Sequence, residues 1–304
     1  MTSRRLAGLA AIFLLLPVSP LVAATFEEAA ALYQDRDYKA AYDIAAELAN
    51  AGDARAEAML GAMFQEGRGV GRDVRQAIDW YQASAQHGHV GAMFALSTIY
   101  LDGSGGYFDR DKAIAWSQKA AAAEHVPAMH NLGLIYAGGA GGEPDWQQAA
   151  QWFSRAAAKG FAESQYNLGV LYAEGKGVEK SPVKAGEWYL RAALQGLADA
   201  ALDYGVMVFR GEGVQKDEKI GAEWLLVSAR RGNPVAQNRV ARLLAAGRGL
   251  KADPVEAVKW HLLASRAGRN DPDLDAYMAR LAPDQRAEAE SLAAAFTPET
   301  NTAR

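Results

Sequence analysis

The sequence predicts an all-α fold, a right-handed α-solenoid built from helix-turn-helix repeats with a 36-residue period. Tryptophan recurs at this spacing without insertion or deletion, at Trp80, Trp116, Trp152, Trp188, Trp224 and Trp260. Two glycines lie 13 and 11 residues before each tryptophan, from Gly67 and Gly69 in the first unit to Gly247 and Gly249 in the sixth. A fixed period of about 20–50 residues is typical of stacked repeats, in which neighbouring units bury a core together that no single unit can bury alone.

The first helix of each repeat is predicted from an apolar stripe upstream of the tryptophan. Leucine lies twenty residues before the tryptophan and an aromatic residue sixteen before it, as Leu60 and Phe64, Leu96 and Tyr100, Leu132 and Tyr136, and Leu168 and Tyr172. With Ala56, Ala92 and Ala128 four residues further upstream, these positions keep the spacing of one helix face. Beside the stripe are glycines that predict a close approach by a neighbouring helix: Gly61, Gly133, Gly169 and Gly205.

The second helix of each repeat contains the tryptophan and has its own start and stop signals. Seven residues before the tryptophan the chain carries Asp73, Asp109, Asp145, Ser181, Asp217 or Asp253. Such a residue caps a helix, because its side-chain oxygen accepts a hydrogen bond from a free backbone N–H of the first turn. Eight residues after the tryptophan comes Gly88, Gly160, Gly196, Gly232 or Gly268, with Glu124 as the one exception. Glycine takes the left-handed conformation that ends many helices, so each second helix is expected to stop there.

The remaining segments flank the repeats. Residues 54–270 form the six full repeats, and residues 25–53 are predicted to be an N-terminal, tetratricopeptide-like helical pair. Residues 271–296 are predicted to be a C-terminal capping pair of helices with a polar outer face. Residues 297–304 are expected to be a flexible tail, since chain ends with few contacts fray.

Two repeats carry a close resemblance to a known family. Residues 131–136 read NLGLIY, and residues 167–178 read NLGVLYAEGKGV. These segments resemble Sel-1-like repeats, which are relatives of the tetratricopeptide repeat with a longer, glycine-rich loop. Repeats five and six depart from the pattern, with Tyr204 and Val240 in place of the leucine and Val208 and Leu244 in place of the aromatic residue. The resemblance implies an α-solenoid in all six units and less predictable surfaces in the last two.

Residues 1–24 are predicted to be a cleavable signal peptide. Arg4 and Arg5 precede an uncharged apolar stretch at residues 6–22, and two small residues ending at Ala24 follow it. A positive end, an apolar middle and a small-residue exit make up a secretory signal. The alternative is a membrane anchor, but a stretch interrupted by two prolines is short for a span of about 20 residues. We expect cleavage after Ala24, a periplasmic or secreted protein, and no stable membrane insertion after cleavage.

Composition and motifs argue against several classes of function. The chain has no cysteine, which removes disulfides, thiolate metal sites and cysteine nucleophiles, and its net charge of −4 offers no basic surface for nucleic acid. His87 and His89 flank one glycine, but two ligands without a third do not make a zinc site. The glycine pairs follow helices rather than strands, which favours turns over nucleotide-binding loops. We expect no enzymatic activity, no cofactor and no metal.

A partner site is predicted on the first helices, which line the concave face of a helical solenoid. In the tetratricopeptide register, the exposed positions of this face lie 22, 21, 18 and 15 residues before each tryptophan. The candidate partner-binding residues are Phe94, His130, Asn131, Leu134, Tyr166, Asn167, Val170, Leu202, Asp203 and Phe209. Apolar side chains supply contact area, and the Asn131 and Asn167 amides can donate to and accept from a peptide backbone. The alternative is that these residues only pack one repeat against the next.

The resemblance implies a non-enzymatic scaffold or adaptor that holds a protein or peptide on its concave face, with roles in envelope signalling or assembly. The identity of this partner is open, and we expect a monomer. An alternative function is binding or hydrolysis of a glycan, a peptidoglycan fragment or a β-lactam on the same scaffold, since Phe94, Tyr166 and Phe209 could stack on sugar rings. A purely structural spacer is the third hypothesis.

Overall fold

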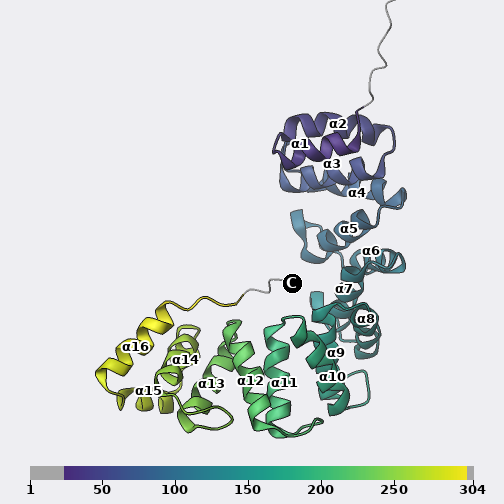
Figure 1. Cartoon of the computed structure of the whole chain (residues 1–304). Helices are drawn as coiled ribbons and strands as arrows, with labels where there is room; N and C mark the ends of the chain where they lie inside the picture. The colour runs from purple at the N-terminus through teal and green to yellow at the C-terminus, as the bar shows by residue number, and fades with distance from the viewer. Residues whose placement is uncertain (1–23, 300–304) are drawn as a thin grey trace, which may run out of the picture. The chain divides into compact units, whose positions relative to one another are not determined.

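A computed structural model describes residues 24–299, which contain sixteen α-helices, two short 3₁₀ turns and no strand (Figure 1). The described residues divide into two compact units, with the boundary between His89 and Val90. The first unit holds α1 (Phe26–Gln34), α2 (Tyr38–Asn50), α3 (Ala54–Glu66) and α4 (Val74–Gln86). The second unit holds α5 (Val90–Asp102), α6 (Arg110–Ala122), α7 (Val126–Tyr136), α8 (Trp146–Ala158), α9 (Ala162–Glu174), α10 (Pro182–Leu194), α11 (Ala198–Arg210), α12 (Glu218–Arg230), α13 (Pro234–Ala246), α14 (Pro254–Arg266), α15 (Pro272–Ala279) and α16 (Pro283–Ala294).

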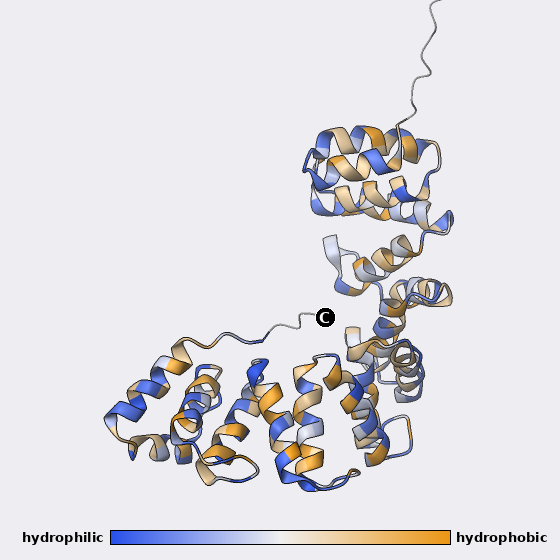
Figure 2. Cartoon of the chain, viewed as in Figure 1, coloured by the Kyte–Doolittle hydropathy of each residue, from blue (hydrophilic) through white to orange (hydrophobic). Residues whose placement is uncertain are grey.

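The predicted all-α solenoid of 36-residue helix pairs is confirmed. From α1 to α4 and from α5 to α14 every helix packs against the next one along the chain, so that odd-numbered first helices alternate with even-numbered second helices, while α16 packs against α14. In Figure 2 polar and apolar residues are mixed in every helix, as expected for helices that bury only one side. None of the helices in residues 24–299 has the length and apolar character needed to cross a membrane. The predicted signal peptide, apart from Ala24, lies outside the described residues.

The predicted second-helix caps are all present. The Gln76 N–H donates to Asp73 Oδ1 at 3.1 Å, and the other four aspartates and Ser181 accept from the third residue of their helices in the same way. The glycines that follow the second helices have positive φ. Glu124 takes the same left-handed conformation, with φ of 63°, where the other repeats have glycine. The start and stop of each second helix were therefore predictable from two residues.

The predicted apolar stripe lies in the core. Leu60, Leu96, Leu132 and Leu168 are at most 2% exposed, while Tyr136 and Tyr172 are half-buried. The close approach predicted at the stripe glycines is also confirmed. A Cβ built on Gly169 would lie 2.7 Å from the ring of Tyr189, which follows the repeat tryptophan. The absence of a side chain at this position lets the two helices of a repeat meet through an aromatic ring.

The loop glycines are turn residues, as predicted. Gly175 ends α9 in the left-handed conformation with φ of 75°. The second loop glycine serves contact between repeats, because a Cβ on Gly177 would lie 2.0 Å from the carbonyl oxygen of Trp146, the first residue of α8. Gly69, Gly213 and Gly249 are held in the same way, so these loops rest against the start of the preceding second helix, whereas Gly141 of repeat three has no atom within 4 Å of its Cβ position.

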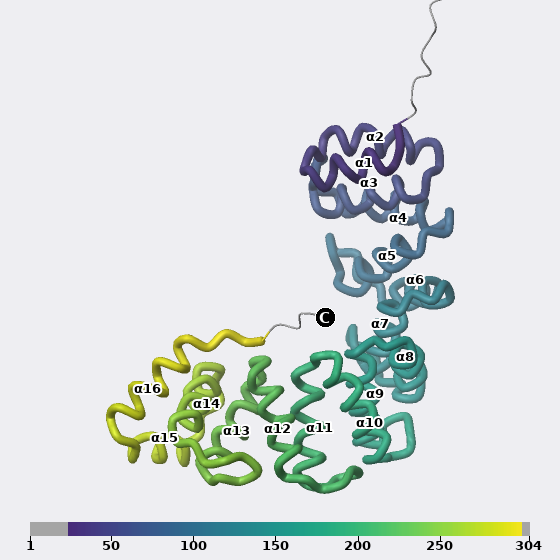
Figure 3. The backbone as a smooth tube through the Cα atoms, in the orientation of Figure 1, coloured from purple at the N-terminus to yellow at the C-terminus, as the bar shows by residue number. Residues whose placement is uncertain are grey.

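The last helices close the second unit differently from a full repeat. Phe296, one period after Trp260, packs edge-on against that ring with centroids 5.4 Å apart, although α16 ends at Ala294. The chain then turns back along the unit (Figure 3), and the Glu299 N–H donates to the Arg230 carbonyl at 2.9 Å. Residues 297–299 of the predicted tail therefore contact α12, and residues 300–304 lie outside the described part.

Candidate functional site

The ten predicted partner-binding residues lie on α5, α7, α9 and α11, the first helices of repeats two to five. We call the surface formed by the first helices the first-helix face. Leu134 is 41% exposed, and the other nine residues are half-buried. Each residue is therefore partly accessible and partly packed, so its individual contacts decide what it can offer to a partner.

Two of these side chains contact neighbouring repeats. The Phe94 ring lies 4.7 Å from the ring of His125, which caps α7. His130 on α7 shares a hydrogen bond of 2.8 Å between its Nδ1 and Ser164 Oγ on α9, and its ring lies 4.9 Å from that of Phe161. Burial lowers the pKa of His130, which favours the neutral ring at neutral pH. Phe94 and His130 thus help to join consecutive repeats.

Tyr166 and Asp203 form a polar link between repeats four and five. The Tyr166 hydroxyl donates to Asp203 Oδ2 at 3.1 Å, and the Tyr166 ring packs 5.6 Å from that of Tyr189. Burial raises the pKa of Asp203 above its ordinary range, although the hydrogen bond from Tyr166 and the charge of Arg239 act in the opposite direction. The predicted site therefore contains a partly desolvated carboxyl group that already has one donor.

The two predicted asparagines keep their amides available. Asn131 and Asn167 are half-buried on α7 and α9, and neither side chain has a hydrogen-bond partner within residues 24–299. Val170 and Leu202 border them and pack partly against buried clusters. Two open amides beside apolar surface are the groups that an extended peptide backbone requires.

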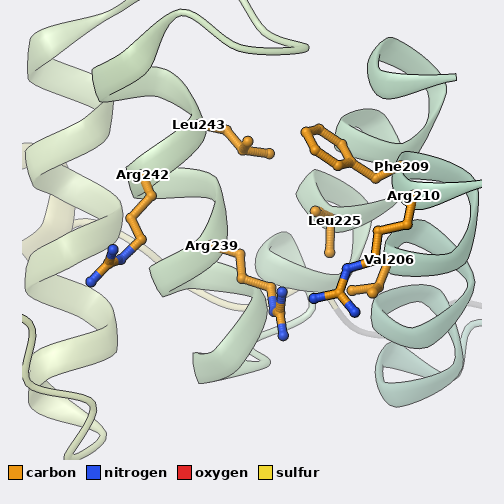
Figure 4. Close-up of a pocket in the computed structure, with 7 residues that line it drawn as sticks. All are labelled: Val206, Phe209, Arg210, Leu225, Arg239, Arg242 and Leu243. Atoms are coloured by element: carbon orange, nitrogen blue, oxygen red, sulfur yellow. The ribbon is translucent and has the colours of Figure 1, made fainter.

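A pocket of about 170 Å³ opens between α11 and α13 (Figure 4). Apolar side chains and three arginines line it: Val206, Phe209, Leu225, Leu243, Arg210, Arg239 and Arg242. Val206 and Phe209 stand 18 and 15 residues before Trp224, and Arg239 and Arg242 stand 21 and 18 before Trp260. The pocket therefore lies at the predicted face positions of repeats five and six.

The three arginines of the pocket differ in their partners. Arg242 donates to both carboxylate oxygens of Asp271, at 2.6 and 2.8 Å. Arg210 lies 3.4 Å from an exposed carboxylate, that of Glu212. Arg239 has no hydrogen-bond or ion-pair partner among the described residues, and its Nε is buried. The Arg239 guanidinium therefore has no direct partner, although its charge acts on the Asp203 carboxyl from a longer distance.

A second, more polar pocket of about 440 Å³ adjoins the first through Val206. Its lining comes from α9, α10, α11 and the loops that follow α9 and α11: Ala173, Lys180, Pro182, Tyr189, Asp203, Val206, Met207 and Glu212. The two pockets together make a depression along α11, with three arginines in one pocket and Asp203, Glu212 and Lys180 in the other. An extended segment could follow this depression across more than one repeat.

Of the seven pocket residues, only Phe209 was among the ten predicted partner-binding residues. Arg239 occupies the same position in repeat six as Asp203 in repeat five, 21 residues before the tryptophan. Extending the register by one repeat would have found it.

Acidic and histidine side chains do not gather in one place among the described residues. Within residues 24–299 no three acidic or histidine side chains lie close enough together to hold a metal ion. His87 instead pairs with Glu57, with its Nδ1 2.8 Å from Oε2.

Comparisons with known proteins agree with this architecture. The model of the Sel1 repeat matches residues 54–89, 90–125, 126–161, 162–197, 198–233 and 234–268. The structure of a protective antigen from uropathogenic Escherichia coli, which displays an SLR fold, is 27% identical with a TM-score of 0.76, and the match covers 88% of this chain. This chain spans only 60% of the antigen structure.

A second structure, that of a Sel1 repeat protein from Oxalobacter formigenes, is 31% identical with a TM-score of 0.67. The match covers 80% of this chain and 100% of that one. No curated protein matches the chain significantly. Proteins with these repeats are generally non-catalytic scaffolds that mediate protein–protein interaction. With six matched repeats over residues 54–268, the chain belongs to the Sel1 repeat family.

Proposed function

We propose that this protein is an exported, non-enzymatic scaffold that holds an extended segment of another protein on its first-helix face. The observation that carries the proposal is the double depression along α11, on the same face as the open amides of Asn131 and Asn167. Apolar walls supply contact area, and the unpaired amides of the face fix a backbone in register. A role in envelope signalling or assembly fits an exported scaffold of this kind.

Site-specific photo-crosslinking tests the binding face. A photoreactive phenylalanine analogue at Val206 is expected to capture a discrete partner in cells, because this position joins the two pockets. The matched control carries the same group at Arg191, an exposed residue on the second helix α10. Equal capture at both positions, or capture only at Arg191, would contradict the proposed face.

Export is part of the proposal and rests on the sequence of residues 1–24. Expression of the full chain, followed by osmotic-shock fractionation and N-terminal sequencing, is expected to yield a shortened protein that starts at Thr25. A chain that retains its N-terminus in the cytoplasm would refute this part and leave the binding face untouched.

The glycan and β-lactam alternative is less well supported by the geometry. Phe94 and Tyr166, two aromatic rings proposed for stacking on sugars, already pack against His125 and Tyr189. A thermal-shift screen with muropeptides and β-lactams is expected to leave the melting temperature unchanged. A concentration-dependent rise with either class would favour the alternative.

A further inference from the structure

The pocket between α11 and α13 is basic in a protein of the opposite net charge. The chain carries 36 acidic and 32 basic residues, yet the lining contains three arginines and no carboxylate. Arg242 is held by Asp271, so its charge is already balanced inside the fold. The remaining positive charge belongs to Arg239 and, in part, to Arg210.

Figure 4 shows the Arg239 and Arg210 side chains extending toward each other from α13 and α11, whereas Arg242 extends away from them. Two guanidinium groups that approach each other repel unless an anion lies between them. The Arg239 Nε is buried without a partner, which is a cost to the folded state that a bound acceptor would remove. Phe209, Leu225 and Leu243 border the same space with apolar surface.

The arginine of the depression in the first unit provides a contrast. Phe26, Tyr33 and Met59 border that depression together with Arg55. Arg55 pairs with Glu27 at 2.7 Å and with Asp53 at 3.3 Å, and it stacks over Phe26. An arginine beside an apolar hollow is thus paired directly with carboxylates of the chain in the first unit, whereas Arg239 has no direct pair among the described residues.

We propose that the α11–α13 pocket recognises an acidic–hydrophobic segment of the partner protein. One apolar side chain enters between Phe209, Leu225 and Leu243, and a neighbouring Asp or Glu accepts hydrogen bonds from Arg239 and Arg210. The adjoining pocket at Val206 lets the chain continue past the carboxylate, which favours an internal segment over a chain terminus. This inference rests on the proposed function and specifies the chemistry of its ligand.

The test uses the chain from residue 25 onward and a library of end-blocked nonapeptides with leucine fixed at the centre. Peptides retained by the immobilised protein are sequenced by mass spectrometry. We expect Asp and Glu to be enriched at least about threefold next to the leucine, and this enrichment to disappear with Arg239→Gln. Arg191→Gln, which removes one exposed positive charge from α10, is the matched control and should keep the enrichment.

The best retained peptide then gives an affinity by fluorescence anisotropy. Arg239→Gln should weaken it at least about tenfold, because a charge-assisted hydrogen bond in a partly desolvated site is lost. Replacing the peptide's Glu by Gln should weaken its binding to the wild type by a similar factor. The same replacement should change the affinity for Arg239→Gln very little. The melting temperature of Arg239→Gln should stay unchanged or rise, since the Arg239 guanidinium makes no hydrogen bond or ion pair with the described residues.

The outcomes separate this inference from the function on which it rests. Retention of peptides without an acidic preference, or equal enrichment in Arg239→Gln, would overturn the acidic ligand while the binding face stands. A lower melting temperature for Arg239→Gln would assign the residue to structure and also overturn the inference. If the protein retains no peptide, both the acidic ligand and the peptide-binding face are wrong.

Discussion

Phe153 covers Gly133 so closely that a Cβ built on the glycine would lie 2.5 Å from Cδ1 of the ring. The ring comes from the second helix of repeat three and the glycine from its first helix. Tyr81 covers Gly61 in repeat one in the same way, at 2.6 Å. Since real Cβ atoms do not approach other atoms this closely, the contact fixes how near the two helices of a repeat can come.

Gly133→Ala should therefore destabilise the protein although alanine favours helices. The methyl group gains about 1 kcal/mol of helix propensity. It also overpacks the contact with Phe153, which costs roughly 1–3 kcal/mol beyond that gain. Urea unfolding followed by circular dichroism measures the difference, and Gly71→Ala is the control because no atom lies within 4 Å of its Cβ position. Equal midpoints for the two variants would show that the helices can separate at no cost.

Glu124 is a second site where one residue can be tested against the repeat pattern. It ends α6 with φ of 63°, where the other repeats carry glycine, and forms an exposed ion pair with Lys159. Glu124→Gly should stabilise the protein by roughly 0.5–1 kcal/mol, because relief of the left-handed strain exceeds the small value of a surface ion pair. Glu124→Ala loses the pair and keeps the strain, so its unfolding midpoint should fall. A fall in both variants would mean that the ion pair dominates.

The fold was predictable from the sequence because the residues that determine it act locally. Glycine, aspartate and tryptophan act through the backbone or through one neighbour at a fixed distance along the chain. Gly175 needs only its own φ, and Asp73 needs only the N–H of Gln76 three residues later. Such local rules repeat every 36 residues, so each unit corroborates the others.

The site was less predictable because it depends on pairs of residues about one period apart. His130 was expected to face a partner, but its contact with Ser164 forms only when two repeats stack. The pocket requires α11 and α13 to leave a hollow, and Arg239 is notable only because no described side chain accepts a hydrogen bond from its buried Nε. Periodicity gives the face on which a residue lies and does not give the partner that a long side chain finds there.

Asp271 should matter more than its place near the chain end suggests. Its carboxylate is 3% exposed, caps α15 and accepts from Arg242 and Asn238 on α13. Asp271→Asn keeps a capping side chain and weakens the contact with Arg242, so it should cost roughly 1–2 kcal/mol. Hydrogen exchange of α15 and α16 measures this loss locally. The control is Asp273→Asn, since Asp273 is 88% exposed and 3.6 Å from Arg242, and it should change little.

The Asp271 carboxylate should also make the stability of α15 and α16 depend on pH. Burial alone would raise the pKa of Asp271, but the hydrogen bonds from Arg242, Asn238 and the Leu274 N–H outweigh burial and hold it below its ordinary 3.8. Its stabilisation is therefore complete above that value and is lost as the pH falls through the lower, folded-state pKa. The exchange protection of α15 and α16 should fall less steeply below pH 4 in Asp271→Asn than in the wild type. If the exchange protection falls equally steeply with pH in both proteins, a group other than Asp271 controls the loss of protection.

We expect a second, milder loss of stability between neutral pH and pH 5, caused by the lowered pKa of His130. Burial lowers the pKa of His130 below its ordinary 6.5, while the nearby charge of Glu163 raises it slightly. The unfolded chain therefore binds a proton at a higher pH than the folded chain, and stability decreases as the pH drops below about 6.5. Urea midpoints at pH 7.5 and 5.5 should differ less for His130→Asn than for the wild type.

Glu163 provides a test of the direction in which the pKa of His130 changes the stability. Glu163 is exposed on α9, so Glu163→Gln should leave the midpoint at pH 7.5 almost unchanged. Without its charge the pKa of His130 falls further, because only burial then acts on the ring. The difference between the two midpoints should therefore increase in Glu163→Gln and decrease in His130→Asn. Changes in the same direction for both variants would mean that His130 does not carry the pH dependence and that His89 or His125, whose pKa values burial also lowers, does.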